Sequence, residues 1–231
     1  MNIIENSKDK LVIRMERNES LMNAIRRSVT EIKTLAIEEV EIFKNDSALY
    51  DEVLAHRLGL IPLKTEKNMN SKTKIDFKLS KKGPCTVYAE DLEGSAEIIY
   101  PKIPITILGE NHKLELVATA TLGDGVYHDK HTPGIFYYRF LLQVNSSPEA
   151  DKIIQESKGL IKPEKKGSKW ICDLDEAVVD KIVEKNKDSV TDSEEMIVVI
   201  ESFGMLTAKE IFLKACDAIV DNLDEVEKLI K

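Results

Sequence analysis

The sequence predicts an α+β protein with a mainly β unit in its middle and an amphipathic helix near each end. Residues 75–144 carry short β-rich runs separated by turn residues, a spacing typical of antiparallel strands. Apolar residues recur at helical spacing in residues 21–32 and again in residues 211–230. The chain has 231 residues, of which 42% are hydrophobic. It can therefore bury a substantial core, and intrinsic disorder is excluded.

The N-terminal part predicts a strand followed by a helix. Residues 11–15 are apolar and β-rich, which favours a strand. Asn18 or Ser20 can cap the helix, because a short polar side chain accepts hydrogen bonds from the free amides of a first turn. Arg26 and Arg27 sit beside the apolar face of this helix. That face consists of four residues at helical spacing: Leu21, Ile25, Val29 and Ile32.

A second strand and a short helix precede the central β unit. The strand is expected at 36–43, and the helix at 51–58, where Gly59 and Pro62 stop it. The runs that predict further strands are 75–79, 85–90, 96–100, 113–120 and 135–144. Residues 146–192 have a different composition, with weak periodicity and an acidic amphipathic helix near 173–187. We expect a small inserted subdomain or a long excursion of the chain there.

The C-terminal segment predicts a strand at 196–200 and then a long helix. Thr207 is the expected N-cap, and Glu210 completes a capping box. The apolar stripe of the helix has 4-3-4-3-4 spacing: Phe212, Cys216, Ile219, Leu223, Val226 and Ile230. One short strand cannot cover so long a stripe, so a partner protein is expected to bury it. The alternative is an ordinary core helix.

Charge is unevenly distributed along the chain. The formal net charge is −8, which argues against a general nucleic-acid binder. Residues 57–82 nevertheless contain eight Lys or Arg and two acidic residues, a local charge of +6. Such a block can attract phosphates or an acidic protein surface, but a solvated loop rim is the simpler explanation and the one we favour. It has no interleaved aromatic residues on which bases would stack.

Composition also indicates the cellular compartment of the protein. No apolar run approaches the roughly 20 residues that a bilayer-spanning helix needs, and residues 1–10 lack the apolar core of a signal peptide. The three cysteines, Cys85, Cys172 and Cys216, are too few and too scattered for a disulfide framework. We therefore expect a cytoplasmic protein.

Motifs for catalysis are missing from the sequence. No glycine has the spacing of a phosphate-binding loop, and Gly123-Asp-Gly125 is explained by a hairpin turn. His128 and His131 are three residues apart in a loop, with no third ligand close in sequence, so a metal site is not expected. We predict no catalytic residues, no cofactor and no metal.

Several ordered motifs resemble the α-type assembly subunit of cellular RNA polymerases, and in particular the archaeal, D-type branch of that family. The motifs are SLMNAIRR at 20–27, TLAIEEVEI at 34–42, NDSALYDEVLAHRLGLIPL at 45–63, GPCTVYAEDL at 83–92, GDGVYHDKHTP at 123–133 and IESFGMLTAKEI at 200–211. The resemblance implies a discontinuous α/β dimerisation domain, an antiparallel sheet with two helices, formed by 1–45 and 193–231. It implies a mainly β insert domain at 46–145, and residues 146–192 occupy the place of a third, ferredoxin-like domain.

The resemblance also implies partners. The dimerisation domain would form a heterodimer with subunit L, and the insert domain would bind the small zinc-binding subunits N and P. The pair would then recruit the two large catalytic subunits. The residues expected at the dimer interface are Leu21, Ile25, Val29, Phe212, Ile219, Leu223, Val226 and Ile230. The residues expected to dock on a large subunit are Arg26, Arg27, His56 and Arg57.

The cysteine content departs from the family pattern. Many members carry cysteine-ligated iron–sulfur clusters in the third domain, whereas residues 146–192 contain only Cys172. A cluster needs at least three thiolates, so we predict a clusterless remnant of that domain. Two other hypotheses remain open: a nucleic-acid-binding module that uses residues 57–82, and, with less support, a stand-alone enzyme or electron carrier.

Overall fold

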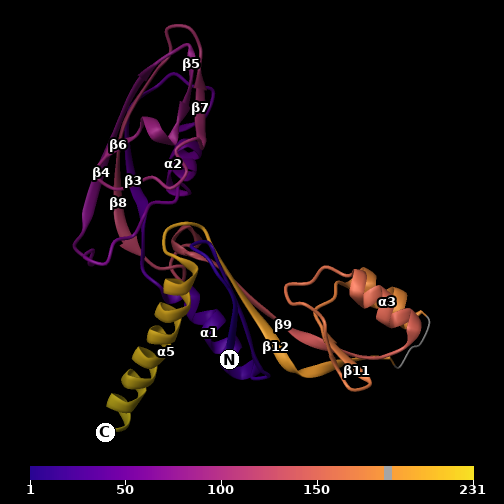
Figure 1. Cartoon of the computed structure of the whole chain (residues 1–231). Coiled ribbons are helices and arrows are strands. Elements are labelled where there is room, and N and C mark those ends of the chain that lie inside the picture. Colours follow the sequence, from indigo (N-terminus) through magenta and orange to yellow (C-terminus); the bar gives the residue numbers. More distant parts are fainter. Residues whose placement is uncertain (185–188) are drawn as a thin grey trace.

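Three antiparallel sheets organise the chain in a computed structural model that describes residues 1–184 and 189–231. Figure 1 shows a central sheet, an insert domain at one end, a third subdomain to the side and a long C-terminal helix that points away from the insert. The prediction of an α+β fold with antiparallel sheets is confirmed.

The central sheet has six strands in the order β1-β2-β12-β9-β11-β10. Their bounds are β1 Asn2–Asn6, β2 Lys10–Glu16, β12 Val190–Ser202, β9 Gly134–Asn145, β11 Lys169–Cys172 and β10 Glu164–Lys166. In the middle of β12, Met196, Val198 and Ile200 pack on one face, and Ile197 and Val199 pack on the other. Because both faces are covered there, this strand is continuously apolar rather than alternating.

Two helices cover one face of the central sheet. They are α1, Glu19–Ser28, and α5, Ala208–Ile230, with the short 3₁₀ turn η1, Val29–Glu31, after α1. The side chain of Asn18 accepts a hydrogen bond from the Leu21 amide at 3.1 Å, as its capping role predicts. Thr207 and Glu210 form the predicted capping box at the start of α5. These caps fix where both helices begin.

The insert domain contains a four-stranded sheet, a two-stranded sheet and a helix. The larger sheet has the order β3-β8-β4-β6, and β5 pairs with β7. The bounds are β3 Thr34–Asn45, β8 Lys113–Gly123, β4 Lys74–Lys82, β6 Glu93–Gly94, β5 Cys85–Tyr88, β7 Pro104–Leu108 and α2 Asp51–Gly59, with 3₁₀ turns η2 Ala89–Asp91 and η3 Asp129–His131. Leu54 and Leu58 of α2 pack with Phe77, Leu79 and Leu116 in its core.

The prediction of a strand at residues 96–100 is wrong. Only Ile98 pairs there, in an isolated bridge to Leu63. The strand that pairs with β5 is β7, which begins at Pro104. A proline at the first position of a strand is tolerated because that amide need not donate to the ladder, but the same proline weakens the sequence signal.

The sheets divide the chain differently from the domain limits expected at residues 45 and 145. β3 pairs with β8 along its whole length, so residues 34–45 belong to the insert sheet. β9 lies between β12 and β11, so residues 134–145 belong to the central sheet. The connections into and out of the insert therefore lie near residues 33 and 133.

The third subdomain has a small core of its own. It contains α3, Pro148–Glu156, α4, Glu176–Val183, and the β10–β11 hairpin that continues the central sheet. Its core consists of Val144, Ala150, Ile154, Trp170, Cys172 and Ile182. The helix expected near 173–187 is shorter, and residues 185–187 of it lie outside the described residues. α3 was not predicted, although Ser147 caps it and Pro148 occupies its first turn.

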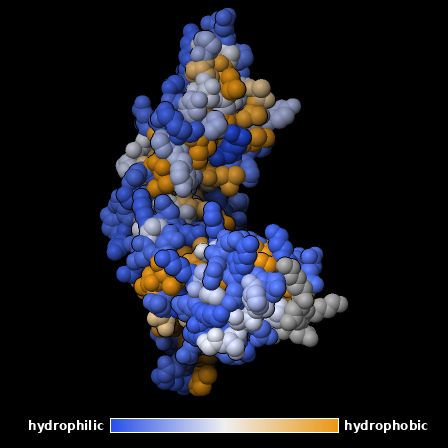
Figure 2. Space-filling model, turned by 45° about the vertical axis from the view of Figure 1, so that its right-hand side comes forward, coloured by the Kyte–Doolittle hydropathy of each residue, from blue (hydrophilic) through white to orange (hydrophobic). Residues whose placement is uncertain are grey.

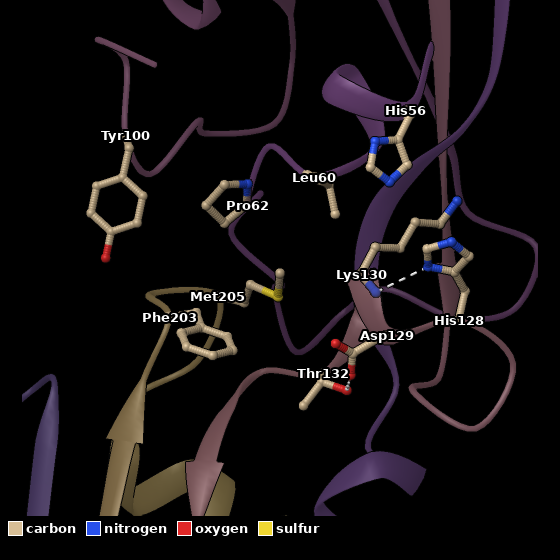
Figure 3. A pocket seen from close by; sticks show the side chains of 10 residues that line it. All are labelled: His56, Leu60, Pro62, Tyr100, His128, Asp129, Lys130, Thr132, Phe203 and Met205. Carbon is tan, nitrogen blue, oxygen red and sulfur yellow. Dashed lines mark hydrogen bonds between the residues drawn. The ribbon is translucent and has the colours of Figure 1, made fainter. Parts of the chain in front are cut away.

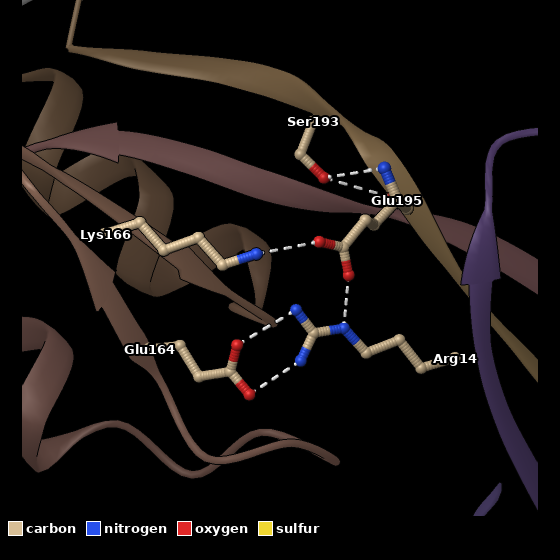
Figure 4. Close-up of polar contacts among 5 residues, drawn as sticks. All are labelled: Arg14, Glu164, Lys166, Ser193 and Glu195. Carbon is tan, nitrogen blue, oxygen red and sulfur yellow. Dashed lines mark hydrogen bonds and ion pairs between the residues drawn. The ribbon is translucent and has the colours of Figure 1, made fainter. Parts of the chain in front are cut away.

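An ion-pair network joins the third subdomain to the central sheet (Figure 4). The Arg14 guanidinium on β2 donates to both carboxylate oxygens of Glu164 on β10, at 2.7 and 3.0 Å. Its Nε donates to Glu195 on β12, which also accepts from Lys166 at 3.1 Å. These two carboxylates hold the pKa of Arg14 above its usual range. A bidentate guanidinium is geometrically specific, so the network sets the position of the hairpin against β2 and β12.

Acid is expected to loosen the third subdomain at Asp151. This carboxylate accepts hydrogen bonds from Lys165 at 2.6 Å and from Trp170 Nε1 at 2.7 Å, and these bonds, with a smaller contribution from Ser146, lower its pKa to about 2. A pKa below the unfolded value means that the contribution is fully present above about pH 4 and is lost as the pH falls toward 2. Trp170 is the only tryptophan in the sequence, so its fluorescence should change in that interval. Asp151→Asn has no carboxylate to titrate at this position, so the fluorescence change in that interval should be absent; an identical titration would contradict the assignment.

Candidate subunit interface

Helix α5 presents two different faces. Ala208, Ile211 and Ala215 are fully buried against the central sheet and α1. Further along, Asn222 Nδ2 donates to Glu31 Oε2 on η1 at 2.8 Å. Every residue from 221 to 230 is exposed. The last turns of α5 therefore project beyond the body of the chain, as Figure 1 shows.

The predicted apolar stripe divides along the helix. Phe212 and Ile219 are half-buried, and the Phe212 ring stacks on Phe136 with centroids 6.5 Å apart. Leu223 is 63% exposed, Val226 52% and Ile230 80%. Apolar side chains also reach the surface at the lower end of the molecule in Figure 2, where α5 ends. An exposed stripe of this length is a feature of protein–protein interfaces.

Helix α1 contributes less accessible surface than its spacing predicts. Leu21 is exposed, but Ile25 and Val29 are 4% and 3% exposed because they pack into the core beneath α5. Ile25 and Val29 are thus buried within the chain itself, and their place at the dimer interface stays a prediction. Both pack where the two helices meet. The exposed apolar side chains of the two helices are Leu21, Leu213, Val220, Leu223, Val226, Leu229 and Ile230, with the edges of Phe212 and Ile219.

The four predicted docking residues fall into two separate groups. Arg26 and Arg27 are exposed in the last turn of α1, and Arg26 donates to Asn23 at 2.9 Å. His56 and Arg57 lie on α2 in the insert domain, away from α1 in Figure 1. Arg57 already donates to the carbonyl oxygens of Ile105 and Pro104, at 2.9 and 2.6 Å, and so fastens α2 to β7. The structure does not bring the two groups together.

A groove of about 490 Å³ runs along the junction between the insert and the central sheet (Figure 3). Its lining comes from both sides: His56, Leu60, Pro62, Tyr100, His128, Asp129, Lys130, Thr132, Phe203 and Met205. The Thr65 amide donates to the Met205 carbonyl at 3.1 Å across this junction. Gly204 has φ of +100°, and a Cβ added there would clash with the Ile99 side chain, so the position favours glycine.

Beside the groove, the loop before β9 is fastened to β3. Lys130 Nζ donates to the Ile37 carbonyl at 3.0 Å and pairs with Glu38 at 2.5 Å. His131 is buried, and its Nδ1 lies 2.9 Å from the Thr34 carbonyl. Burial lowers the pKa of His131, which favours the neutral ring. The two histidines considered as metal ligands thus have structural contacts, since His128 Nδ1 accepts from the Lys130 amide at 3.1 Å. Among the described residues, no three potential ligands gather in a metal-binding arrangement.

The basic segment 57–82 is partly neutralised. Lys64 pairs with Glu97 at 2.5 Å, Lys67 lies 3.8 Å from Glu210, and Lys81 pairs with Asp91. The remaining lysines are exposed on β4 and the preceding loop: Lys72, Lys74, Lys78 and Lys82. The segment therefore offers a short row of lysines on one strand rather than a closed phosphate site.

The three cysteines lie in different parts of the fold, in β5, β11 and α5. Cys172 is fully buried in the core of the third subdomain, where burial raises the pKa of its thiol to about 12. Its Sγ lies 3.7 Å from the Leu142 carbonyl. Cys85 and Cys216 are half-buried and unpaired. Residues 146–192 thus offer one buried thiol, whereas an iron–sulfur cluster needs at least three thiolates.

Comparison with known proteins identifies the family to which this chain belongs. The family model of the RNA polymerase Rpb3/RpoA insert domain matches residues 31–137, a range that agrees with the sheet boundaries at β3 and β9. Together with relatives that match most of the chain, this makes the chain an α-type RNA polymerase subunit, part of a multisubunit nucleotidyltransferase that carries out transcription.

The full-length relatives define the family more narrowly. DNA-directed RNA polymerase subunit Rpo3 of Methanothermobacter thermautotrophicus is 31% identical over 89% of this chain and 88% of the relative. Rpo3 of Halobacterium salinarum is 32% identical over 90% and 88%, and that of Methanocaldococcus jannaschii 38% over 62% and 80%. The chain belongs to the archaeal Rpo3 family, the D-type branch of the α-type subunits. In the described part of the chain, no helix is both long and apolar enough to cross a membrane.

Proposed function

We propose that this chain is the assembly platform of a cytoplasmic archaeal RNA polymerase and has no catalytic residues of its own. It forms a heterodimer with subunit L through Leu21 and the exposed stripe of α5. The insert domain then binds the small zinc-binding subunits N and P, and the pair recruits the two large catalytic subunits. The observation that carries the proposal is the end of α5, whose apolar residues have no partner within the described chain.

The insert and the two arginines of α1 have separate tasks in this proposal. Arg26 and Arg27 are exposed guanidinium groups, suited to carboxylates and carbonyls of a large subunit. His56 lies at the rim of the junction groove and serves the same docking, whereas Arg57 acts by fixing α2 to β7. Co-expression with a candidate subunit L tests the first step. A stable 1:1 complex is expected, and a chain that stays monomeric and ignores subunit L would contradict the proposal.

We also propose that the third subdomain works without an iron–sulfur cluster. Cys172 is the one cysteine in residues 146–192, and Trp170, Ile154 and Ile182 fill the core around it. Protein purified anaerobically should contain no stoichiometric iron and no sulfur-to-iron charge-transfer absorbance. Iron at about one cluster per chain would refute this, and Cys172→Ala would then show whether the thiol binds it.

The alternative, a nucleic-acid-binding module based on residues 57–82, has less support. Three of its lysines lie against carboxylates, and Arg57 is bound to backbone carbonyls. Binding of DNA by the isolated chain, with a steep salt dependence and lost on Lys72→Glu and Lys74→Glu, would favour the alternative.

A further inference from the structure

Two chain connections join the insert to the central sheet, and they differ in length. In the first, only two residues separate Ile32, in the core beneath α1 and α5, from Leu35, in the core of the insert. The second runs from Leu122, which packs on the insert core, to Phe136, which packs on the central sheet, and is much longer. The orientation of the insert therefore depends on how the longer connection is held.

Thr34 and His131 fasten the longer connection to the shorter one. The Thr34 hydroxyl donates to the His131 carbonyl at 2.6 Å, and His131 Nδ1 lies 2.9 Å from the Thr34 carbonyl. Both residues are at most 1% exposed. The imidazole lies over Gly123, the β8 partner of Thr34, where a Cβ would come within 2.5 Å of Nε2. Reciprocal hydrogen bonds away from water are costly to break, so this pair, which we call the clamp, is a rigid contact.

The clamp is built around a neutral imidazole. A carbonyl oxygen only accepts hydrogen bonds, so Nδ1 of His131 carries the proton and Nε2 does not. Nε2 lies 3.8 Å from Glu38 Oε2 on β3. That carboxylate is already paired with Lys130 Nζ on η3 at 2.5 Å, and β8 contributes only the uncharged Gly123. A proton on Nε2 would therefore place two cations beside one carboxylate, around a ring that is closed to water, which is unfavourable.

The direction of the pH dependence follows from this arrangement. Burial is the main cause that lowers the pKa of His131, and the Lys130 cation acts in the same direction. A lowered pKa means that the closed clamp binds a proton less tightly than the open one. Its stability is therefore fully present above the ordinary histidine pKa of about 6.5 and is lost as the pH falls below it.

We propose that Thr34 and His131 form a pH-sensitive clamp: with a neutral imidazole it holds the insert at one orientation to the central sheet, and protonation of the ring releases the longer connection so that the insert can swing. The hydrogen bond from the Thr65 amide to the Met205 carbonyl remains, so release loosens the junction without separating the domains. This inference goes beyond the proposed function and needs no partner, because it concerns the chain alone.

The test measures the distance between spin labels on the two sides of the junction in the full chain. Glu110→Cys places a label on the exposed turn after β7, and Glu16→Cys places one at the exposed end of β2. Cys85→Ala and Cys216→Ala remove the two half-buried thiols, and the buried Cys172 stays. Pulsed electron spin resonance should give one narrow distance distribution at about pH 7.5 and a broad one at about pH 5.5, with an unchanged far-UV circular dichroism spectrum. A narrow distribution at both pH values would overturn the proposal.

Two substitutions of His131 separate the hydrogen bond from the charge. Asparagine places an amide nitrogen near the position of Nδ1 and cannot be protonated, so His131→Asn should keep the narrow distribution at both pH values. His131→Phe keeps a ring without a donor and should broaden the distribution already near neutral pH. Thr34→Val removes the other hydrogen bond with little change of shape and should do the same, including where His131→Phe fails to fold. The matched control, Thr119→Val, removes a hydroxyl that donates to Asp76 at 2.8 Å within the insert sheet, and should behave as the wild type.

The imidazole supplies a second readout. NMR of the ring nitrogens should show His131 as the Nδ1–H tautomer near neutral pH, and the midpoint of its titration should coincide with the midpoint of the broadening. Acid broadening that persists in His131→Asn would show that another group controls the junction, and narrow distributions near neutral pH in Thr34→Val and His131→Phe would show that the clamp does not hold the insert. Either result would overturn the proposal. None of these measurements involves subunit L, so the platform role stands or fails separately.

Discussion

Replacing Leu223 by Asp is expected to abolish pairing with subunit L and to leave the fold of the chain unchanged. Leu223 is 63% exposed in the chain, so a carboxylate there remains hydrated when the chain is alone. In the complex the same carboxylate is buried against apolar side chains, which costs several kcal/mol without a compensating partner. Because 1.4 kcal/mol is a factor of about ten in Kd, the loss should exceed about a hundredfold.

Co-purification and thermal unfolding measure these two effects separately. The matched control is Ile107→Asp, an equally drastic change at an exposed position of β7 in the insert domain. It should retain the complex with subunit L. Normal pairing by Leu223→Asp would show that the exposed stripe of α5 is not the interface, and a large drop in its Tm would show that Leu223 belongs to the chain's own core.

Replacing Ile211 by Ala should destabilise the chain itself, whereas Leu223→Asp should leave its fold unchanged. Ile211 is fully buried where α5 meets the central sheet, close to Gly134 at the start of β9. Truncating a buried Ile removes apolar contacts and leaves a cavity, which typically costs about 2–5 kcal/mol of unfolding free energy. Chemical denaturation should show that loss. Leu223→Ala truncates an exposed side chain on the same helix and should change the stability by less than about 0.5 kcal/mol. Equal destabilisation by the two variants would contradict the two-face description of α5.

The sequence predicts the long elements well because their signals are local. The caps at Asn18 and Thr207 and the apolar spacing of α1 and α5 all act within one helix, and the structure has both helices where these signals place them. Short elements are different. β1 is exposed at every residue and depends on pairing with β2, so nothing in residues 2–6 alone identifies it. β7 has three buried residues, but the proline at its first position weakens its signal.

Domain limits and side-chain roles depend on pairings that are distant in sequence. β3 follows α1 along the chain, yet its partner β8 lies about 80 residues later, so the order of the elements does not reveal the sheet that it joins. Ile25 and Leu21 share one helical stripe, and only the position of α5 decides that Ile25 is buried and Leu21 exposed. Arg57 likewise resembles a surface arginine until β7 is seen to accept its hydrogen bonds.

The most direct test of the central claim is the mass of the species formed when the full chain is mixed with an equimolar archaeal subunit L. Sedimentation velocity should show a single 1:1 heterodimer for the wild type, and two separate species for Leu223→Asp. Two separate species already in the wild-type mixture, with the chain alone stable and monomeric, would contradict the role of α5 as the pairing surface of an assembly platform.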